Sequence, residues 1–364
     1  MKIAAQISRY LVGLVFIFSG LIKLNDPVGT QIKLEEYFEV FAQDLPFMQV
    51  FFHGLVPFAL YIAVFLCVAE VVLGVALLLR YKPKATIFFL LLIIIFFSFL
   101  TFYSAYFNKV TDCGCFGDAI KLKPWTSFLK DLILLVLIIV IMINQRFIKP
   151  LPTGLFVALA TVGSLGLAFY AITHLPPIDM LPYKIGNSIP EQMKPSEPYK
   201  FEYVFEKDGK THRFSTFPDD TTYIYKDMIT LNEDKARPKI TDYRVWNDST
   251  DFTQESFQGN KLILIIKSLK DINTAAFPTI RKTIEGLEGS NVETYIFTSV
   301  GSADIENFLR EQQLDVPYFF ADATVLKTIS RSNPGLWLLS DGVVKGKWHY
   351  NDTPDAATVI KAVE

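Results

Sequence analysis

Five long apolar segments dominate the first half of the chain. A helix needs about 20 mostly apolar residues to cross the hydrocarbon core of a bilayer. The stretch from Ala85 to Phe107 reaches that length without a charge, and the stretch that begins at Gly54 contains only Glu70. The pattern predicts an α-helical membrane bundle, with four core helices in residues 1–150 and a fifth span in residues 151–177. The expected spans cover residues 10–24, 54–79, 85–107, 125–144 and 154–172.

The second half has the pattern of a soluble region in two parts. Residues 178–250 begin with a linker of four prolines, which suits an extended connector, and continue with a predicted β-hairpin around Asp208-Gly209. From residue 251, apolar strands alternate with amphipathic helices, which is typical of an α/β domain. Strands are expected at 262–266, 292–298, 318–321, 335–339 and 343–350, and helices at 277–287, 303–313, 323–329 and 354–363.

Basic residues orient the bundle, because short loops rich in lysine and arginine stay in the cytoplasm. They precede the first span and follow the second and the fourth, whereas the loop at 25–50 is acidic. We expect a cytoplasmic N-terminus, an outer loop at 108–124 and an outer C-terminal domain, as in an inner-membrane protein with a periplasmic domain. In the acidic loop, residues 31–42 are amphipathic and should lie at the membrane interface as a lid on the bundle. The basic residues are Lys2, Arg9, Arg80, Lys82, Lys84, Arg146 and Lys149.

Composition narrows the class of partner. The net charge is −2 and the isoelectric point about 6.1, so there is no electrostatic reason to expect nucleic acid. The expected partners are the lipid bilayer and, through the outer domain, an envelope protein. The three cysteines, Cys67, Cys113 and Cys115, are too few for a disulfide framework.

Cys113 and Cys115 are the strongest chemical signal. Gly114 separates them and Gly117 follows, so the backbone can bend enough for the two sulfurs to meet. A disulfide across so short a span departs from relaxed geometry and should be easily reduced, as catalytic disulfides are. The predicted outer location is one in which disulfides persist. A structural disulfide and a copper or zinc site remain as alternatives, the latter with His53 and His174 as nearby ligands.

Glu70 is a second candidate, because a carboxylate deep in an apolar helix often relays protons. It follows Cys67 by three residues on the same helical face, and we expect it to exchange protons when a thiol couple turns over. Cys67 is interpreted as a small hydrophobic residue, roughly 20 Å below the outer surface. Lys23 is expected to lie too high in the first span to pair with Glu70. Lys130 and Asp131 are expected at the outer interface.

Residues 6–148 resemble the DoxX and MauE group of redox-associated membrane proteins. The likeness is carried by FIFSGLIKLNDPVG with Lys23, by Glu70 in CVAEVVLG, and by Cys113 and Cys115 in DCGCFGD. Four-helix membrane proteins of related design, the vitamin K epoxide reductases and the quinone-linked disulfide oxidases, transfer electrons between thiols and quinone. The resemblance therefore implies a quinone as electron partner, although their membrane-embedded Cys-x-x-Cys is missing here.

Residues 251–364 resemble the periplasmic thioredoxin-like proteins. The segment SRSNPGLWLLSDGVVKGKWHY carries the likeness, with Pro334 at the position of that family's cis-proline. The family's Cys-x-x-Cys would fall within SLKDINTAAF, where there is no cysteine. The resemblance thus implies a degenerate module that docks a partner, rather than catalysis by Ser268, Lys270 or Asp271.

These patterns favour a membrane protein of thiol–disulfide exchange, a possible oxidoreductase with Cys113, Cys115 and Glu70 as its reactive residues. A non-enzymatic scaffold or assembly factor of the cell envelope is the second hypothesis, and metal handling by the cysteine pair is the third.

Overall fold

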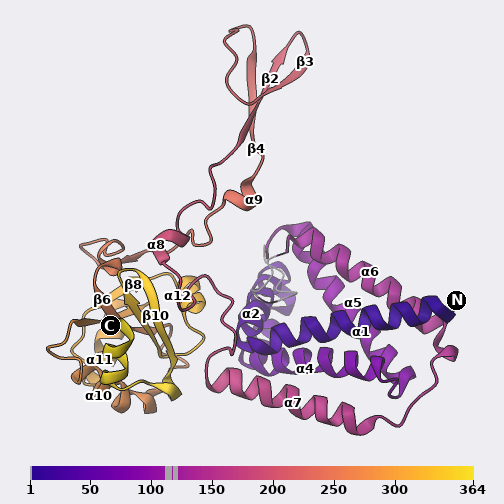
Figure 1. Cartoon of the computed structure of the whole chain (residues 1–364), viewed down its shortest axis with the longest axis horizontal. Coiled ribbons are helices and arrows are strands. Elements are labelled where there is room, and N and C mark those ends of the chain that lie inside the picture. The colour runs from indigo at the N-terminus through magenta and orange to yellow at the C-terminus, as the bar shows by residue number, and fades with distance from the viewer. Residues whose placement is uncertain (1, 111–116, 118–121) are drawn as a thin grey trace. The chain divides into compact units, whose positions relative to one another are not determined.

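The computed structural model describes residues 2–110, 117 and 122–364. The chain forms two compact units, Met1–Leu181 and Pro182–Glu364, and each is described by itself. Figure 1 shows a helical first unit and a second unit that contains the strands.

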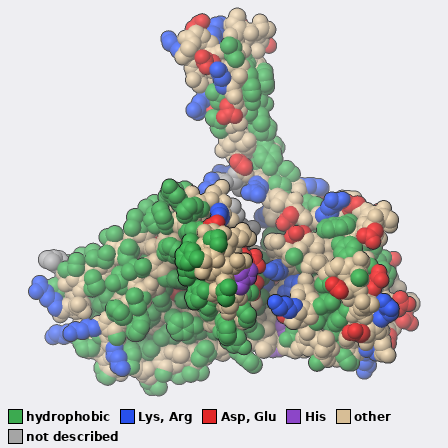
Figure 2. Space-filling view, turned by 180° about the vertical axis from the view of Figure 1, so that it is seen from behind, with side chains coloured by type: hydrophobic (Ala, Val, Ile, Leu, Met, Phe, Trp, Pro, Cys, Tyr) green, Lys and Arg blue, Asp and Glu red, His purple; other side chains and the backbone are tan. Residues whose placement is uncertain are grey.

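Five apolar helices in the first unit are long enough to cross a membrane. Many of their large apolar side chains face outward, and Figure 2 shows hydrophobic side chains covering the visible face of this unit. The five predicted spans are thereby confirmed, and the chain is a multi-pass membrane protein. The helices are α1 (Lys2–Asn25), α4 (Ala59–Leu78, preceded by the short α3, Gln49–Leu55), α5 (Pro83–Phe107), α6 (Pro124–Ile143) and α7 (Gly154–Thr173).

The predicted amphipathic segment forms α2 (Pro27–Asp44), which is longer than expected. Asp26 begins the helix by accepting a hydrogen bond from the backbone N–H of Gly29 at 2.8 Å. The apolar face of α2 packs on the bundle, as a lid would. Leu34 and Phe38 contact the α4 region, and Tyr37 and Phe41 pack with Leu100 and Val110.

Glycines allow α1 and α4 to pack closely. A Cβ on Gly20 would lie 2.6 Å from Val71 Cγ2, and one on Gly74 would lie 2.9 Å from the carbonyl oxygen of Gly13. Real Cβ atoms do not approach other atoms this closely, so a larger residue at either position would push the helices apart. Small residues at such contacts are a common device of membrane helices.

Asn25, the last residue of α1, holds the segment that follows α7. Its side-chain Nδ2 donates to the carbonyl oxygen of Ile178 at 2.8 Å, and its Oδ1 accepts from the N–H of Ile178 at 3.0 Å. The first unit therefore ends in a segment that is bonded back to the bundle.

The second unit is built on a six-stranded sheet in the order β10-β9-β6-β7-β8-β5. β6 (Asn260–Ile266), β7 (Val292–Thr298) and β8 (Tyr318–Ala321) are parallel. β9 (Gly335–Ser340) and β10 (Val343–His349) form an antiparallel hairpin on one side, and β5 (Val245–Trp246) pairs antiparallel with β8 at the other edge. The α/β domain predicted from the alternating pattern is confirmed, whereas β5 was not foreseen.

Helices bury both faces of this sheet. Leu262 and Leu264 of β6 face one core, which is completed by α10 (Phe277–Glu285), α11 (Ser302–Glu311) and α13 (Ala356–Val363). Ile263 and Ile265 face the other, together with Trp337, α8 (Ile189–Gln192) and α12 (Ala323–Ile329). Burial on both faces explains why β6 is a continuous apolar run rather than an alternating one.

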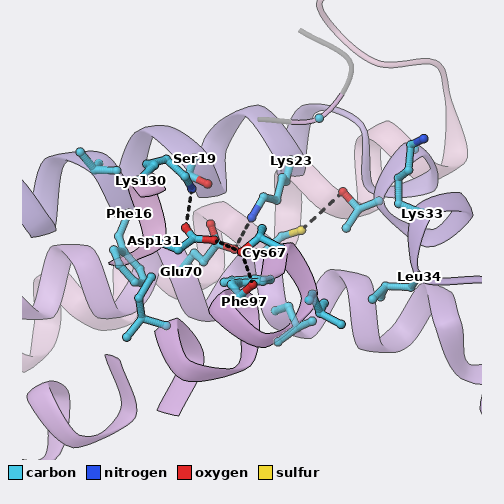
Figure 3. Close-up of a pocket in the computed structure, with 18 of the residues that line it drawn as sticks. Phe16, Ser19, Lys23, Lys33, Leu34, Cys67, Glu70, Phe97, Lys130 and Asp131 are labelled. Carbon is cyan, nitrogen blue, oxygen red and sulfur yellow. Dashed lines mark hydrogen bonds and ion pairs between the residues drawn. The ribbon is translucent and has the colours of Figure 1, made fainter. Parts of the chain in front are cut away.

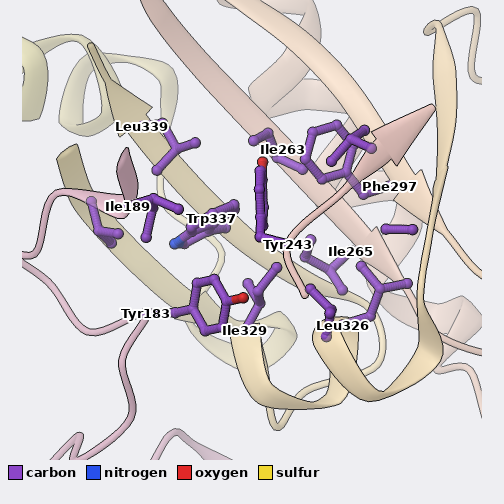
Figure 4. Packing of buried hydrophobic residues seen from close by; sticks show 14 of the residues in the cluster. Tyr183, Ile189, Tyr243, Ile263, Ile265, Phe297, Leu326, Ile329, Trp337 and Leu339 are labelled. Atoms are coloured by element: carbon purple, nitrogen blue, oxygen red, sulfur yellow. The ribbon is translucent and has the colours of Figure 1, made fainter. Parts of the chain in front are cut away.

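The proline-rich linker differs from the expected extended connector. Tyr183 and Ile189, and further on Ile240 and Tyr243, are buried in the same core as Trp337 (Figure 4). The ring of Tyr183 lies edge-on to Trp337, with ring centroids 6.0 Å apart. These residues are scattered singly among polar ones, so no periodic pattern revealed that they belong to the core.

A separate three-stranded sheet has the order β3-β2-β4. β2 (Phe201–Lys207) and β3 (Lys210–Phe214) are the predicted hairpin, and β4 (Ile224–Thr230) adds a strand that was not foreseen. Asp208 and Gly209 both have positive φ, as a tight hairpin turn requires. The short α9 (Glu233–Ala236) follows.

Candidate functional site

A cavity of about 70 Å³ lies inside the first unit, between α1, α2, α4, α5 and α6 (Figure 3). Its walls are largely apolar, and its interior carries an unusual set of charged and polar side chains. They are Ser19 and Lys23 of α1, Cys67 and Glu70 of α4, Thr101 of α5 and Asp131 of α6.

Lys23 and Glu70 form a buried ion pair in this cavity. Lys23 Nζ lies 2.5 Å from Glu70 Oε1, and the two side chains are only 6% and 2% exposed. The Lys23 ammonium also lies 4.4 Å from the centre of the Phe97 ring, a favourable cation–π distance. The expectation that Lys23 lies too high to reach Glu70 is wrong. The glycine contact at Gly20 brings α1 close to α4, and α2 covers the end of α1, so Lys23 turns inward.

Asp131 is a second buried carboxylate, only 1% exposed. Its Oδ2 accepts a hydrogen bond from Thr101 Oγ1 at 3.0 Å, and its Oδ1 lies 2.8 Å from Lys130 Nζ. Asp131 therefore faces the bundle interior, while its expected depth near the outer interface stays a prediction. A helical pattern signals this position, because Asp131 precedes the buried Leu134 and Ile138 by three and seven residues.

Cys67 is a free, fully buried thiol in the same cavity. Its Sγ lies 4.0 Å from Thr30 Oγ1, at the start of α2. The structure thus brings Cys67 together with Glu70, as the shared helical face predicted, and adds Lys23.

Cys113 and Cys115 lie outside the described residues. The chain on both sides of them is placed. Val110 is buried against Tyr37 and Phe41, and Gly117 lines the cavity. Lys109 and Tyr103 both donate hydrogen bonds to Asp44 at the end of α2. These two hydrogen bonds hold the pKa of the Asp44 carboxyl below its usual value.

The two histidines expected as metal ligands lie on different elements. The ring of His174 stacks on Tyr170, with centroids 4.7 Å apart, and His53 lies in α3. Within the described residues, no three His, Cys, Asp or Glu side chains gather as metal ligands would.

In the second unit, the loop after β6 is held by hydrogen bonds to Asn333. Asn333 Nδ2 donates to the carbonyl oxygen of Ser268 at 2.8 Å and to Asp271 Oδ1 at 3.2 Å. Asn333 Oδ1 accepts from the N–H of Lys267 at 3.0 Å. The Asn333–Pro334 peptide bond is cis, at the predicted position. Ser268 and Asp271 are thus joined through Asn333 to the segment that contains Pro334.

Three comparisons place the chain among known proteins. No curated protein matches it. The structure of the mitochondrial 2-Cys peroxiredoxin from Plasmodium falciparum is similar at 12% identity over 47% of this chain and 90% of that chain, with a TM-score of 0.23, too low to support an argument about the fold. Residues 1–144 match the family model of the methylamine utilisation protein MauE. The first four membrane-spanning helices of this chain are thus similar to MauE.

Proposed function

We propose that this protein is a thiol–disulfide redox protein of the inner membrane, in which Cys113 and Cys115 form the exchangeable pair. Glu70 would supply or accept protons from the cavity. The observation that carries the proposal is the position of Gly117. This residue is two positions from Cys115 in the sequence and lines the cavity that contains Glu70, Lys23 and Cys67. Gly117, the described residue nearest to the cysteine pair in the sequence, therefore lies beside the buried charges.

The similarity to MauE supports a membrane role, and that family's name associates it with methylamine utilisation. The asymmetry of lysine and arginine supports a cytoplasmic N-terminus. With five spans, the second unit then lies on the outer side, in the compartment where disulfides persist.

The exchange conserves atoms and electrons. A thiolate of a reduced envelope partner attacks one sulfur of the Cys113–Cys115 disulfide and forms a mixed disulfide. The second thiolate of the partner then attacks the partner's own sulfur in the mixed disulfide and displaces the cysteine thiolate of this protein. The partner leaves with a disulfide, and Cys113 and Cys115 remain as a dithiol that holds two more electrons and two more protons than the starting disulfide.

A quinone is the electron acceptor that the family resemblance implies for reoxidation. When bound, such a group would accept two electrons and two protons. The rings of Phe16 and Phe97 line the cavity, but its volume of about 70 Å³ is well below the roughly 300–1,000 Å³ of pockets that hold such ligands, so a quinone does not fit inside it and would bind elsewhere on the bundle.

The second unit would dock the partner. Parallel strands with an antiparallel hairpin at the edge, helices on both faces and the loop at Pro334 support a thioredoxin-like interpretation. All three cysteines precede residue 116, so this unit cannot exchange disulfides itself.

Thiol trapping in native membranes tests the proposal. Membranes are equilibrated in buffers of defined redox potential, and free thiols are alkylated with a mass tag. We expect Cys113 and Cys115 to change together from oxidised to reduced near the potential of the envelope, with Cys67→Ser as the matched control that leaves this transition unchanged. A pair that stays oxidised throughout is structural, and a pair protected only by added copper or zinc is a metal site; either result would defeat the redox proposal.

A scaffold of the cell envelope is the second candidate function. The absence of cysteine from residues 182–364 favours it. The double variant Cys113→Ser with Cys115→Ser separates the two. A scaffold keeps both its crosslinked neighbours and its function, whereas a redox protein keeps a docked neighbour but loses the mixed disulfide and its function.

A further inference from the structure

Asp131 is a buried carboxylate that the proposed function does not use. It lines the same cavity as Glu70, and each carboxylate contacts an ammonium group: Lys130 lies next to Asp131 and Lys23 next to Glu70 (Figure 3). A carboxylate inside a membrane bundle is costly and is usually retained for a function. The two acids come from different helices, α4 and α6, so the cavity joins them.

The cavity has room for water next to both acids. One water needs roughly 10–15 Å³ of such space and two to four polar partners, and the cavity offers about 70 Å³. Ser19, Thr101 and the two ion pairs supply the partners. A small cluster of waters therefore fits between Glu70 and Asp131, and hydrogen-bonded water conducts protons.

The cavity opens at one end. Its polar residues near the start of α2, Asp26, Thr30 and Lys33, keep partial exposure, as does Gly117. Towards the other end of the bundle, a tightly packed apolar layer closes it, formed by Val12, Phe16, Leu77, Leu90, Ile94 and Ile138. Among the described residues, the α2 end therefore offers the polar route for protons, and the apolar layer offers no polar group to carry them.

We infer that Asp131 is a second proton-relay residue, connected to Glu70 by water in a cavity that opens at the α2 end. The inference rests on the proposed thiol function for its purpose: oxidation of one dithiol releases two protons with two electrons. The electrons pass to the quinone-class acceptor, and each proton can be held in transit by one carboxylate, Glu70 or Asp131. One carboxylate for each of the two protons accounts for the two buried acids, Glu70 and Asp131.

Protonation of Asp131 depends on every charged or titratable group that faces the cavity. Lys130 lies on its own helix, and the others belong to the helices packed around it. They are Lys23 of α1, Asp26 and the α2 residues Lys33 and Tyr37, and Cys67 and Glu70 of α4.

Water access is tested first, without reference to redox activity. In a background of Cys67→Ser, Cys113→Ser and Cys115→Ser, Thr101→Cys is exposed to a charged, membrane-impermeant thiol reagent in sealed vesicles of each orientation. Ile133→Cys is the control, because Ile133 lies two residues from Asp131 but is 53% exposed on the outer surface of the bundle. We expect Thr101→Cys to react in one orientation only and Ile133→Cys in neither. No reaction at Thr101→Cys, or reaction from both sides, would overturn the inference.

The relay itself is tested by the pH profile of dithiol oxidation in membranes supplied with a water-soluble quinone. We expect Asp131→Asn to slow oxidation by about 100-fold, the lower end of what a positioned proton carrier contributes, and to flatten its pH dependence. Asp131→Glu should restore part of the rate and the pH dependence, whereas a purely structural role would leave the profile unchanged in shape. Cys113→Ser with Cys115→Ser serves as the reference. If that variant oxidises dithiols normally, the proposed function fails; if it is inactive and Asp131→Asn behaves as the parent, only the relay fails.

Discussion

Lys23 and Glu70 form a buried ion pair in which each residue offsets the cost of burying the other's charge. Moving a charge out of water is costly, and the attraction between partners in an apolar interior offsets that cost. At 2.5 Å and with both side chains almost fully buried, each group is the other's closely placed counter-charge. The pair therefore behaves as one unit, and the loss of either member leaves a buried charge behind.

Lys23→Met should lower the stability of the protein in detergent by about 3–5 kcal/mol, because Glu70 then lies buried without its partner. Replacing both residues, Lys23→Met with Glu70→Leu, should recover most of that loss, since the apolar pair leaves no charge uncompensated. Thermal unfolding of the two single variants and the double variant measures the coupling. Additive losses in the double variant would contradict the pairing.

The helix contact between α1 and α4 determines where those charges meet. Gly20 is three residues before Lys23, and its backbone lies against Val71, next to Glu70. The side chain of Lys23 reaches Glu70 because no Cβ separates the two helices at this point.

Gly20→Ala should destabilise the bundle by about 1–3 kcal/mol, the usual cost of overpacking. Gly163→Ala is the matched control: it places the same methyl group in α7, where no described atom beyond the surrounding turn of that helix lies within 4 Å of the new Cβ. We expect Gly163→Ala to leave stability unchanged or slightly higher, because alanine favours helix over glycine. Equal effects of the two substitutions in thermal unfolding would show that the glycine contact is unimportant.

At the scale of elements, apolar periodicity predicted the spans, the hairpin at Asp208-Gly209 and most of the α/β elements. β4 and β5 escaped it for physical reasons. β5 is only two residues long, and β4 is largely exposed on both faces, so neither carries an alternating apolar pattern. The site was predicted in part. Glu70 and Cys67 follow from helical spacing, but the Lys23 contact depends on how two distant helices pack, which spacing along one helix does not reveal.

The whole molecule divides after Leu181, so the second unit should fold alone. A fragment of residues 182–364 should unfold cooperatively on heating, whereas a fragment of residues 251–364 should not. The shorter piece lacks five buried core residues, worth about 1.5–3 kcal/mol each, and that sum rivals the total stability of about 5–15 kcal/mol of a typical domain. They are Tyr183, Ile189, Ile240, Tyr243 and Val245.

Circular dichroism of the two purified fragments measures this difference. A stable, cooperative 251–364 fragment would contradict the assignment of the proline-rich segment to the core. A 182–364 fragment that fails to fold would show that the second unit depends on the membrane-spanning unit for its stability.

The two hydrogen bonds from Asn25 to Ile178 have a practical consequence for protein engineering. They anchor the polypeptide where it leaves the bundle, so a reporter or protease site placed just beyond Leu181 would have a defined attachment point. Exchange of the entire second unit at this junction would keep every contact of the cavity, which makes the junction the natural place for chimeras.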